Sequence, residues 1–106
     1  MTYDESFSAL SDPRRRAIFE SLRAGAKSVA AIALEQPVSR PAVSQHLKVL
    51  QTAGLVQVTI KGTRHFYQIR RDGLVALREY IEGFWQDTLD AFATHVHDSI
   101  ETEKET

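Results

Sequence analysis

The 106-residue sequence predicts a mainly α-helical fold that carries one β-hairpin, an α+β domain. Apolar residues recur at intervals of three and four through most of the chain, which is the period of an amphipathic helix. After Gly54 the period changes to two over residues 56–69, which is the period of paired strands. The length and the apolar share of 42% suit one globular domain. We expect this domain to span residues 1–100, followed by a frayed tail over residues 101–106.

Two short helices are expected first, with a strong helix start between them. Residues 3–10 form the first helical segment. Asp12 and Pro13 then supply a capping side chain and a proline at the first helical position, and the second helix ends before Gly25. Its first turn carries Arg14–Arg16, although the N-terminal end of a helix is positively polarised and disfavours cations. Nearby phosphate groups would offset this cost; the alternative is a basic surface that only aids solubility.

A helix, a tight turn and another helix follow. Ser28 is placed to cap a helix over residues 29–36, and Pro37 forces the chain to turn because proline restricts the residue before it. The helix over residues 39–53 comes next. This succession predicts a helix-turn-helix, in which the second helix reads DNA.

The predicted recognition helix, residues 39–53, has a clear start, stop and core-facing side. Ser39 can accept a hydrogen bond from the backbone N–H of Ala42, and Pro41 is harmless in the first turn. Gly54 provides the left-handed residue of a Schellman ending, with Leu50 contacting Leu55. One apolar stripe faces the core; it consists of Val43, Leu47 and Leu50.

The opposite face of this helix carries hydrogen-bond donors and no carboxylate. Such a face suits the major groove, where base edges and phosphates accept hydrogen bonds. The alternative is a solvated helix face, which normally carries Glu among its Lys. The predicted DNA-contacting residues on this helix are Ser39, Arg40, Ala42, Ser44, Gln45, His46 and Lys48.

The hairpin over residues 56–69 is predicted to form a wing. A two-residue turn at Gly62-Thr63 has glycine first, as a type II′ turn requires. This register pairs Val58 with Tyr67 and Val56 with Ile69, so that apolar residues meet on one face. It also places Lys61 opposite Arg64, which is unfavourable unless an anion lies between them. Lys61, Thr63 and Arg64 are therefore predicted DNA contacts; an exposed tip made basic for solubility is the alternative.

The last helix is predicted over residues 71–100, about 42 Å at the helical rise. Its apolar residues recur at threes and fours, yet no later element can cover the far half. An uncovered aromatic surface marks a partner site, and a second copy across a two-fold axis is the simplest partner. The predicted interface of this homodimer comprises Tyr3, Phe7, Leu77, Ile81, Phe84, Trp85, Leu89 and Phe92.

The net charge of −1 hides a segregation of charge along the chain. Residues 13–78 contain twelve Lys or Arg against three acids, whereas residues 79–106 contain eight acids against one Lys. A basic middle between acidic ends predicts a polyanion, here double-stranded DNA, as the partner of the middle. Chance clustering of the basic residues is the alternative.

Other classes of function are disfavoured. The absence of cysteine excludes disulfides, thiolate metal sites and a thiol nucleophile. The N-terminus does not resemble a signal peptide and no apolar stretch reaches roughly 18 residues, so we expect a soluble cytoplasmic protein with no membrane partner. We expect no enzyme and no cofactor, because Ser44 and His46 do not face each other on a helix and no phosphate-binding glycine loop occurs. A protein-only helical adaptor is the alternative, but it leaves the basic middle unexplained.

Two segments carry a specific resemblance, FSALSDPRRRAIFESL and SRPAVSQHLKVLQTAGLV. With the wing KGTRHFYQI and the closing amphipathic helix, they resemble the ArsR/SmtB family of winged helix-turn-helix repressors over residues 3–98. The resemblance implies a dimer that binds an operator near a promoter and blocks transcription. The DNA-contact positions that it implies are Ser39, Arg40, Ala42, Ser44, Gln45 and His46, with Lys61 and Arg64 in the wing.

The sequence also departs from this family. Many relatives sense metals through a cysteine pair in the helix before the recognition helix, and that helix has no thiol here. The Asp-x-His spacing of another family metal site is absent from the last helix. The chain therefore resembles the branch without the cysteine motif, and no metal is predicted. A metal-responsive repressor is the alternative, because His97 and Glu101 lie one turn apart and could share an ion.

The predicted mechanism divides the contacts by role. A dimer would place its two recognition helices in successive major grooves, about 34–36 Å apart, on an inverted repeat. Phosphate contacts would supply most of the affinity, and Gln45, Arg40 and Ser44 would supply the sequence preference. Two interpretations of His46 remain open: it contacts a base or phosphate, or it bonds within the fold. No inducer is identified.

Overall fold

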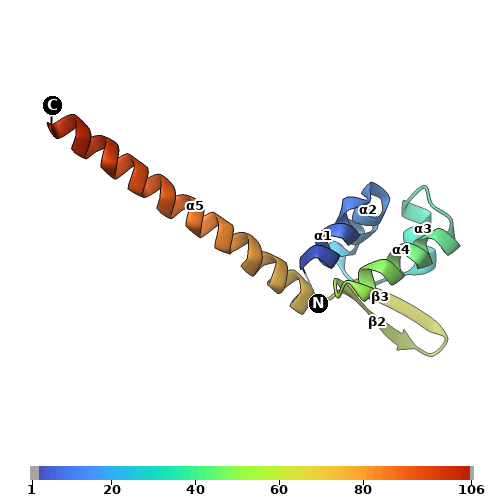
Figure 1. Cartoon of the computed structure of the whole chain (residues 1–106). Coiled ribbons are helices and arrows are strands. Elements are labelled where there is room, and N and C mark those ends of the chain that lie inside the picture. Colours follow the sequence, from blue (N-terminus) through green and yellow to red (C-terminus); the bar gives the residue numbers. More distant parts are fainter. Residues whose placement is uncertain (1–2, 106) are drawn as a thin grey trace.

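The structure is a computed structural model that describes residues 3–105, with side chains described through His97. Figure 1 shows a small body of short helices and a hairpin, from which one long helix projects. This architecture confirms the predicted winged helix-turn-helix. The elements over these residues are α1 (Tyr3–Ser11), α2 (Pro13–Ser21), η1 (Leu22–Ala24), β1 (Lys27–Ser28), α3 (Val29–Glu35), α4 (Arg40–Thr52), β2 (Val56–Lys61), β3 (Arg64–Ile69) and α5 (Arg71–Glu105).

The helices of the body begin at the capping residues that the sequence predicts. Each capping side chain accepts hydrogen bonds from backbone N–H groups that have no partner within the helix, which stabilises the first turn. The capping bonds run to Asp12 Oδ1 from the N–H groups of Arg14 (2.9 Å) and Arg15 (3.1 Å), to Ser28 Oγ from Ala31 (3.1 Å), and to Ser39 Oγ from Ala42 (3.3 Å).

The end of α4 has the predicted Schellman geometry. Gly54 has a φ of 78°, in the left-handed region. Its N–H donates to the carbonyl of Gln51 at 3.0 Å, and the N–H of Leu55 donates to the carbonyl of Leu50 at 3.0 Å. Leu50 and Leu55 are both fully buried. The chain therefore leaves α4 in a fixed direction and enters the wing with its first apolar residue in the core.

The core lies between α2, α3, α4 and the base of the hairpin. Its fully buried side chains include Ile18, Ile32 and the three apolar residues of α4 that were predicted to face inward: Val43, Leu47 and Leu50. Leu77 of α5 also belongs to this core, with only 7% of its surface exposed. The prediction that Leu77 lies in a dimer interface is therefore wrong. The first turns of α5 pack on the body of the same chain, and this contact could not be seen in the helical period alone.

The hairpin has the predicted register, and a third strand extends it. Val58 pairs with Tyr67, Val56 with Ile69, and Lys61 with Arg64. Gly62 opens the turn with a φ of 61°. Beyond the prediction, β1 pairs antiparallel with β3, so that the order is β1-β3-β2. A two-residue strand is too short to show a period in the sequence.

Helix α5 is longer than predicted and is anchored at its start. It runs through Glu105, so that residues 101–105 continue the helix instead of forming a separate frayed tail. These residues are rich in Glu and Lys, which have high helix propensity. Near the start, a Cβ at Gly73 would overlap the carbonyl oxygen of Gly54. The two backbones therefore pack closely, and this contact fixes α5 on the body. Of the helices described, none is long and apolar enough to cross a membrane.

Candidate nucleic-acid interface

The predicted contact residues of α4 lie on the surface of the body. Ser39, Arg40, Ser44, Gln45 and Lys48 are exposed, whereas Ala42 and His46 are half-buried at the edge of the face. The core stripe fixes the rotation of α4, because Leu47 and its apolar neighbours hold the opposite side. The donor side chains therefore project from a rigid element rather than from a loop, which is what an interface for a duplex requires.

The cations on this surface form no ion pair with the side chains that the structure describes. The ion pairs over the described residues join Arg15 to Asp12, Lys27 to Glu35, Arg70 to Asp72 and Arg78 to Glu82. Arg40 and Lys48 of α4 take part in none of them, nor do Lys61 and Arg64 of the wing. Four positive charges per chain therefore remain available for phosphate groups.

The tip of the wing has the charge arrangement that the hairpin register predicts. Lys61 and Arg64 lie directly opposite each other, and both are exposed together with Thr63. The ammonium of Lys61 lies 5.9 Å from the centroid of the Phe66 ring, at the outer limit of a cation–π contact. This contact orients Lys61 without neutralising it. The tip can therefore approach an anion from two sides.

The arginines at the start of α2 have partners that the sequence did not indicate. The guanidinium of Arg14 donates to the carbonyl of Pro37 at 3.3 Å, and that of Arg16 donates to the carbonyl of Leu10 at 2.9 Å. Arg15 lies 3.8 Å from Asp12. These contacts join the start of α2 to α1 and to the turn before α4. They explain the arginines structurally, so that phosphate groups are not required at this helix end.

Asp12 is the titratable group beside this cluster that is clearly perturbed. The backbone N–H of Arg15 lowers the pKa of Asp12 below its ordinary value, and the N–H of Arg14 acts in the same direction. The positive charge of Arg15 adds a smaller effect in the same direction. Both interpretations of His46 stay open, since its side chain lies half-buried at the edge of the α4 face.

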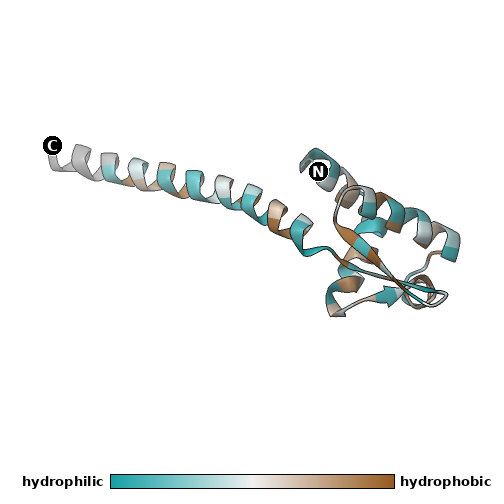
Figure 2. Ribbon diagram, turned by 90° about the horizontal axis from the view of Figure 1, so that it is seen from below, coloured by the Kyte–Doolittle hydropathy of each residue, from teal (hydrophilic) through white to brown (hydrophobic). Residues whose placement is uncertain are grey.

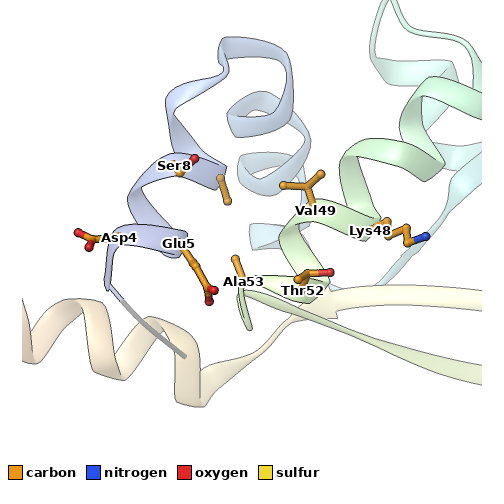
Figure 3. Close-up of a pocket in the computed structure, with 8 residues that line it drawn as sticks. Asp4, Glu5, Ser8, Lys48, Val49, Thr52 and Ala53 are labelled. Carbon is orange, nitrogen blue, oxygen red and sulfur yellow. The ribbon is translucent and has the colours of Figure 1, made fainter.

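Lys48 occupies the border between the recognition surface and a hollow next to α1. With Val49 and Thr52 of α4, it lines a groove of about 500 Å³ whose other wall includes Asp4 and Glu5. Figure 3 shows the side-chain nitrogen of Lys48 directed away from both carboxylates. Val49 lies on this outer face of α4 with 41% of its surface exposed. The polar recognition surface is therefore concentrated in the first half of α4.

The apolar side chains along α5 beyond the body are exposed. Phe84, Trp85 and Phe92 have 59%, 64% and 65% of their surfaces exposed, and Ile81 and Leu89 are exposed as well. Figure 2 shows apolar segments along α5 where it extends past the body. The predicted dimer residues other than Leu77 are thus free of the core of their own chain. We call the set Ile81, Phe84, Trp85, Leu89, Phe92 and Val96 the α5 stripe.

An aromatic cluster joins α1 to the beginning of this stripe. The rings of Tyr3 and Tyr80 stack at 4.4 Å between centroids, and Phe7 lies 5.6 Å from Tyr80. Tyr80 also meets the edge of Phe84 at 4.9 Å. Tyr80 was missed in the sequence, because its role depends on the position of α1. The cluster confirms that Tyr3 and Phe7 lie beside the α5 stripe.

The part of the chain that is described contains no cluster of metal-binding side chains. Among residues 3–97, no group of three or more His, Asp or Glu side chains is arranged to hold an ion. His97 is exposed on α5, and the side chain of Glu101 lies outside the described residues. A shared ion at these two residues therefore stays the untested alternative to the prediction of no metal.

Known proteins resemble this chain in sequence. A helix-turn-helix domain model matches residues 10–59. The HTH-type transcriptional regulator Rv2034 of Mycobacterium tuberculosis is 50% identical over 90 residues, covering 85% of this chain and 84% of that protein. The transcriptional repressor SdpR of Bacillus subtilis is 35% identical over 63 residues, covering 59% of this chain and 70% of that protein.

Solved structures share the fold. The crystal structure of a possible transcriptional regulator for arsenical resistance has a TM-score of 0.70 and 35% identity, covering 88% of this chain and 96% of that chain. The solution NMR structure of the homodimeric winged helix-turn-helix DNA-binding domain Mb0332 from Mycobacterium bovis, a possible ArsR-family regulator, has a TM-score of 0.65 and 27% identity, covering 83% and 82%. The folded arrangement and these similarities together show that the chain belongs to the ArsR family of winged helix-turn-helix transcriptional regulators.

Proposed function

We propose that the chain is a homodimeric repressor that binds an inverted-repeat operator in double-stranded DNA. Its membership of a family of transcriptional regulators supports the general function, and the repressor SdpR among its relatives supports the direction of the effect. The protein would act in the cytoplasm by occupying DNA, with no chemical step of its own.

The observation that carries the proposal is the unneutralised surface formed by α4 and the wing. Arg40, Lys48, Lys61 and Arg64 have no carboxylate partner among the described side chains, and Ser44 and Gln45 stand exposed between them. Cations supply affinity for the phosphate backbone, whereas the amide of Gln45 can form two hydrogen bonds with an adenine edge. A solvated helix face in a protein-binding adaptor would not need this separation of charge.

Dimerisation through α5 follows from the exposed apolar surface of the α5 stripe. The exposure of large aromatic side chains such as Trp85 and Phe92 to water is unfavourable, and the exposed apolar surface extends along several turns of α5. A second copy offers the same stripe and closes the assembly by two-fold symmetry. The homodimeric Mycobacterium bovis domain of similar fold supports this arrangement. Two copies would present their α4 helices to successive major grooves, about 34–36 Å apart.

The test is the salt dependence of binding to genomic fragments selected with the purified protein. Four free cations per chain give eight per dimer, so that about eight phosphates are neutralised on binding. The logarithm of the association constant should then fall against the logarithm of salt concentration with a slope of about −7. A slope near zero in an anisotropy titration would refute the proposed interface, as expected for a protein-only adaptor.

The oligomeric state is tested separately by sedimentation equilibrium at micromolar concentration. The chain contains a single tryptophan, Trp85, and it lies in the α5 stripe. Its fluorescence should therefore shift to shorter wavelength as the concentration rises and the stripe becomes buried. A chain that sediments as a monomer with a fully hydrated Trp85 would contradict the proposed dimer.

A further inference from the structure

A basic hollow lies at the base of the wing, on the hairpin face that carries Lys61 and Arg64 at its tip. It has a volume of about 450 Å³ and is formed where η1, the hairpin and the start of α5 meet. Its lining includes Arg23 of η1, together with Arg70 and Arg71 from the junction between β3 and α5. Gln57 and Gln68 pair across the two strands and contribute side-chain amides. Three arginines and two glutamines thus line one concave surface.

The positive charge of this hollow is only weakly compensated. Asp72 is the acidic residue of its lining, and it lies 4.0 Å from Arg70 with 82% of its side chain exposed. So long and hydrated an ion pair provides little stabilisation. Arg23 and Arg71 have no hydrogen-bond or ionic partner among the described side chains. Cations gathered without partners repel one another, and an anion would relieve this repulsion.

The position of the hollow separates it from the tip of the wing. The pair Gln57–Gln68 lies four residues along the strands from the pair Lys61–Arg64, which corresponds to about 13 Å. Figure 1 shows the tip of the hairpin pointing away from the start of α5. A phosphate held at the tip therefore does not occupy the hollow. The volume of the hollow suits a small molecule and not a polymer.

We propose that this hollow binds a small, multiply charged oxyanion such as a phosphorylated metabolite. Guanidinium groups form paired hydrogen bonds with phosphate or carboxylate oxygens, and the amides of Gln57 and Gln68 add neutral donors. An occupant would bridge Arg23 of the DNA-binding body and Arg71 of the helix proposed to form the dimer. The regulatory consequence rests on the proposed function: an anion that binds the free protein and the DNA-bound protein with different affinity changes DNA affinity, and DNA changes anion affinity by the same factor.

Calorimetric titration of the full chain with inorganic pyrophosphate, without DNA, tests the site directly. Citrate in a second titration distinguishes phosphate from carboxylate recognition. Pyrophosphate should bind with one site per chain, and Arg23→Ala and Arg71→Ala should each weaken binding tenfold or more. Arg78→Ala is the matched control, because it removes the same charge from α5 outside the hollow, where Arg78 pairs with Glu82 at 2.8 Å. It should leave pyrophosphate affinity within about twofold of the original protein.

Three outcomes would overturn the proposal. The first is the absence of pyrophosphate and citrate binding to the original chain, and the second is an equal loss of affinity in the Arg78→Ala control. The third is found in DNA titrations without added anion. If Arg23→Ala and Arg71→Ala weaken duplex binding as strongly as Lys61→Ala does, the hollow is a DNA contact instead. Because anion binding is measured without DNA, its failure leaves the proposed function intact. Circular dichroism checks that each variant is folded.

Discussion

Replacing Gly73 with alanine tests how α5 is attached to the body. The new Cβ would overlap the carbonyl oxygen of Gly54 and lie 3.0 Å from its carbonyl carbon and 3.4 Å from the Cα of Leu55. All three atoms belong to the backbone, and Gly54 is held by the Schellman hydrogen bonds. No flexible side chain can move aside to make room. Forced overpacking of this kind costs about 1–3 kcal/mol.

The helix propensity of alanine partly offsets this cost. Alanine is more favourable than glycine inside a helix by about 1 kcal/mol. The net expectation for Gly73→Ala is therefore a loss of up to about 2 kcal/mol of unfolding free energy. The matched control is Gly83→Ala in the same helix, because a Cβ at that position meets no atom within 4 Å beyond its adjacent residues and the nearby helix backbone. This control should gain about 0.5–1 kcal/mol from helix propensity alone.

Urea denaturation followed by far-UV circular dichroism measures both variants. The protein concentration must be the same in every sample, since a dimer gains stability with concentration. The two glycine variants should move the midpoint in opposite directions. If Gly73→Ala stabilises the protein as much as Gly83→Ala does, the close approach of α5 to the turn after α4 is refuted.

Three further predictions address the cap, the dimer and DNA recognition. Asp12→Asn keeps a capping acceptor but loses the charge. Because the pKa of Asp12 is lowered in the folded state, the original protein should be more stable than the variant above about pH 4, and this advantage should disappear as the pH falls through the folded-state pKa. Acid denaturation of both proteins measures the difference. Phe92→Glu should shift the dimer dissociation constant upward by tenfold or more in sedimentation equilibrium, whereas Gln86→Glu, which adds the same charge away from the α5 stripe, should not. Gln45→Ala should reduce discrimination among operators by about 1–3 kcal/mol, while Lys61→Ala should weaken all sequences alike; equal losses on every sequence would contradict these separate roles.

The features that depend on neighbours in sequence were predictable. The caps at Asp12, Ser28 and Ser39, the ending at Gly54 and the hairpin register all follow from a few consecutive residues. Each is a local hydrogen-bonding requirement that particular residue types satisfy. The same holds for the exposed face of α4, since its apolar stripe determines which residues are left outside. The exposed face of α4 can therefore be predicted without the arrangement of the helices.

The features that depend on distant neighbours were not predictable. Leu77 fits the period of the α5 stripe, but its burial depends on how α5 meets the body. Tyr80 acquires its role from α1, and Arg14 and Arg16 acquire theirs from backbone carbonyls on other elements. The two-residue strand β1 exists only because β3 lies beside it. A period shows which side of a helix is apolar, but it does not show what covers that side.

The unbroken course of α5 links the attachment at Gly73 mechanically to the α5 stripe. The helix has 35 residues and is about 52 Å long, so a rotation about its axis at one end also rotates the other end. One residue inserted between Leu77 and Ile81 would turn the stripe by about 100° relative to the body. Two copies joined through such a stripe would direct their α4 helices to different sides of a duplex. A four-residue insertion would restore the direction to within about 40°. In the proposed dimer, the relative direction of the two α4 helices would therefore depend on the number of residues between the body and the α5 stripe.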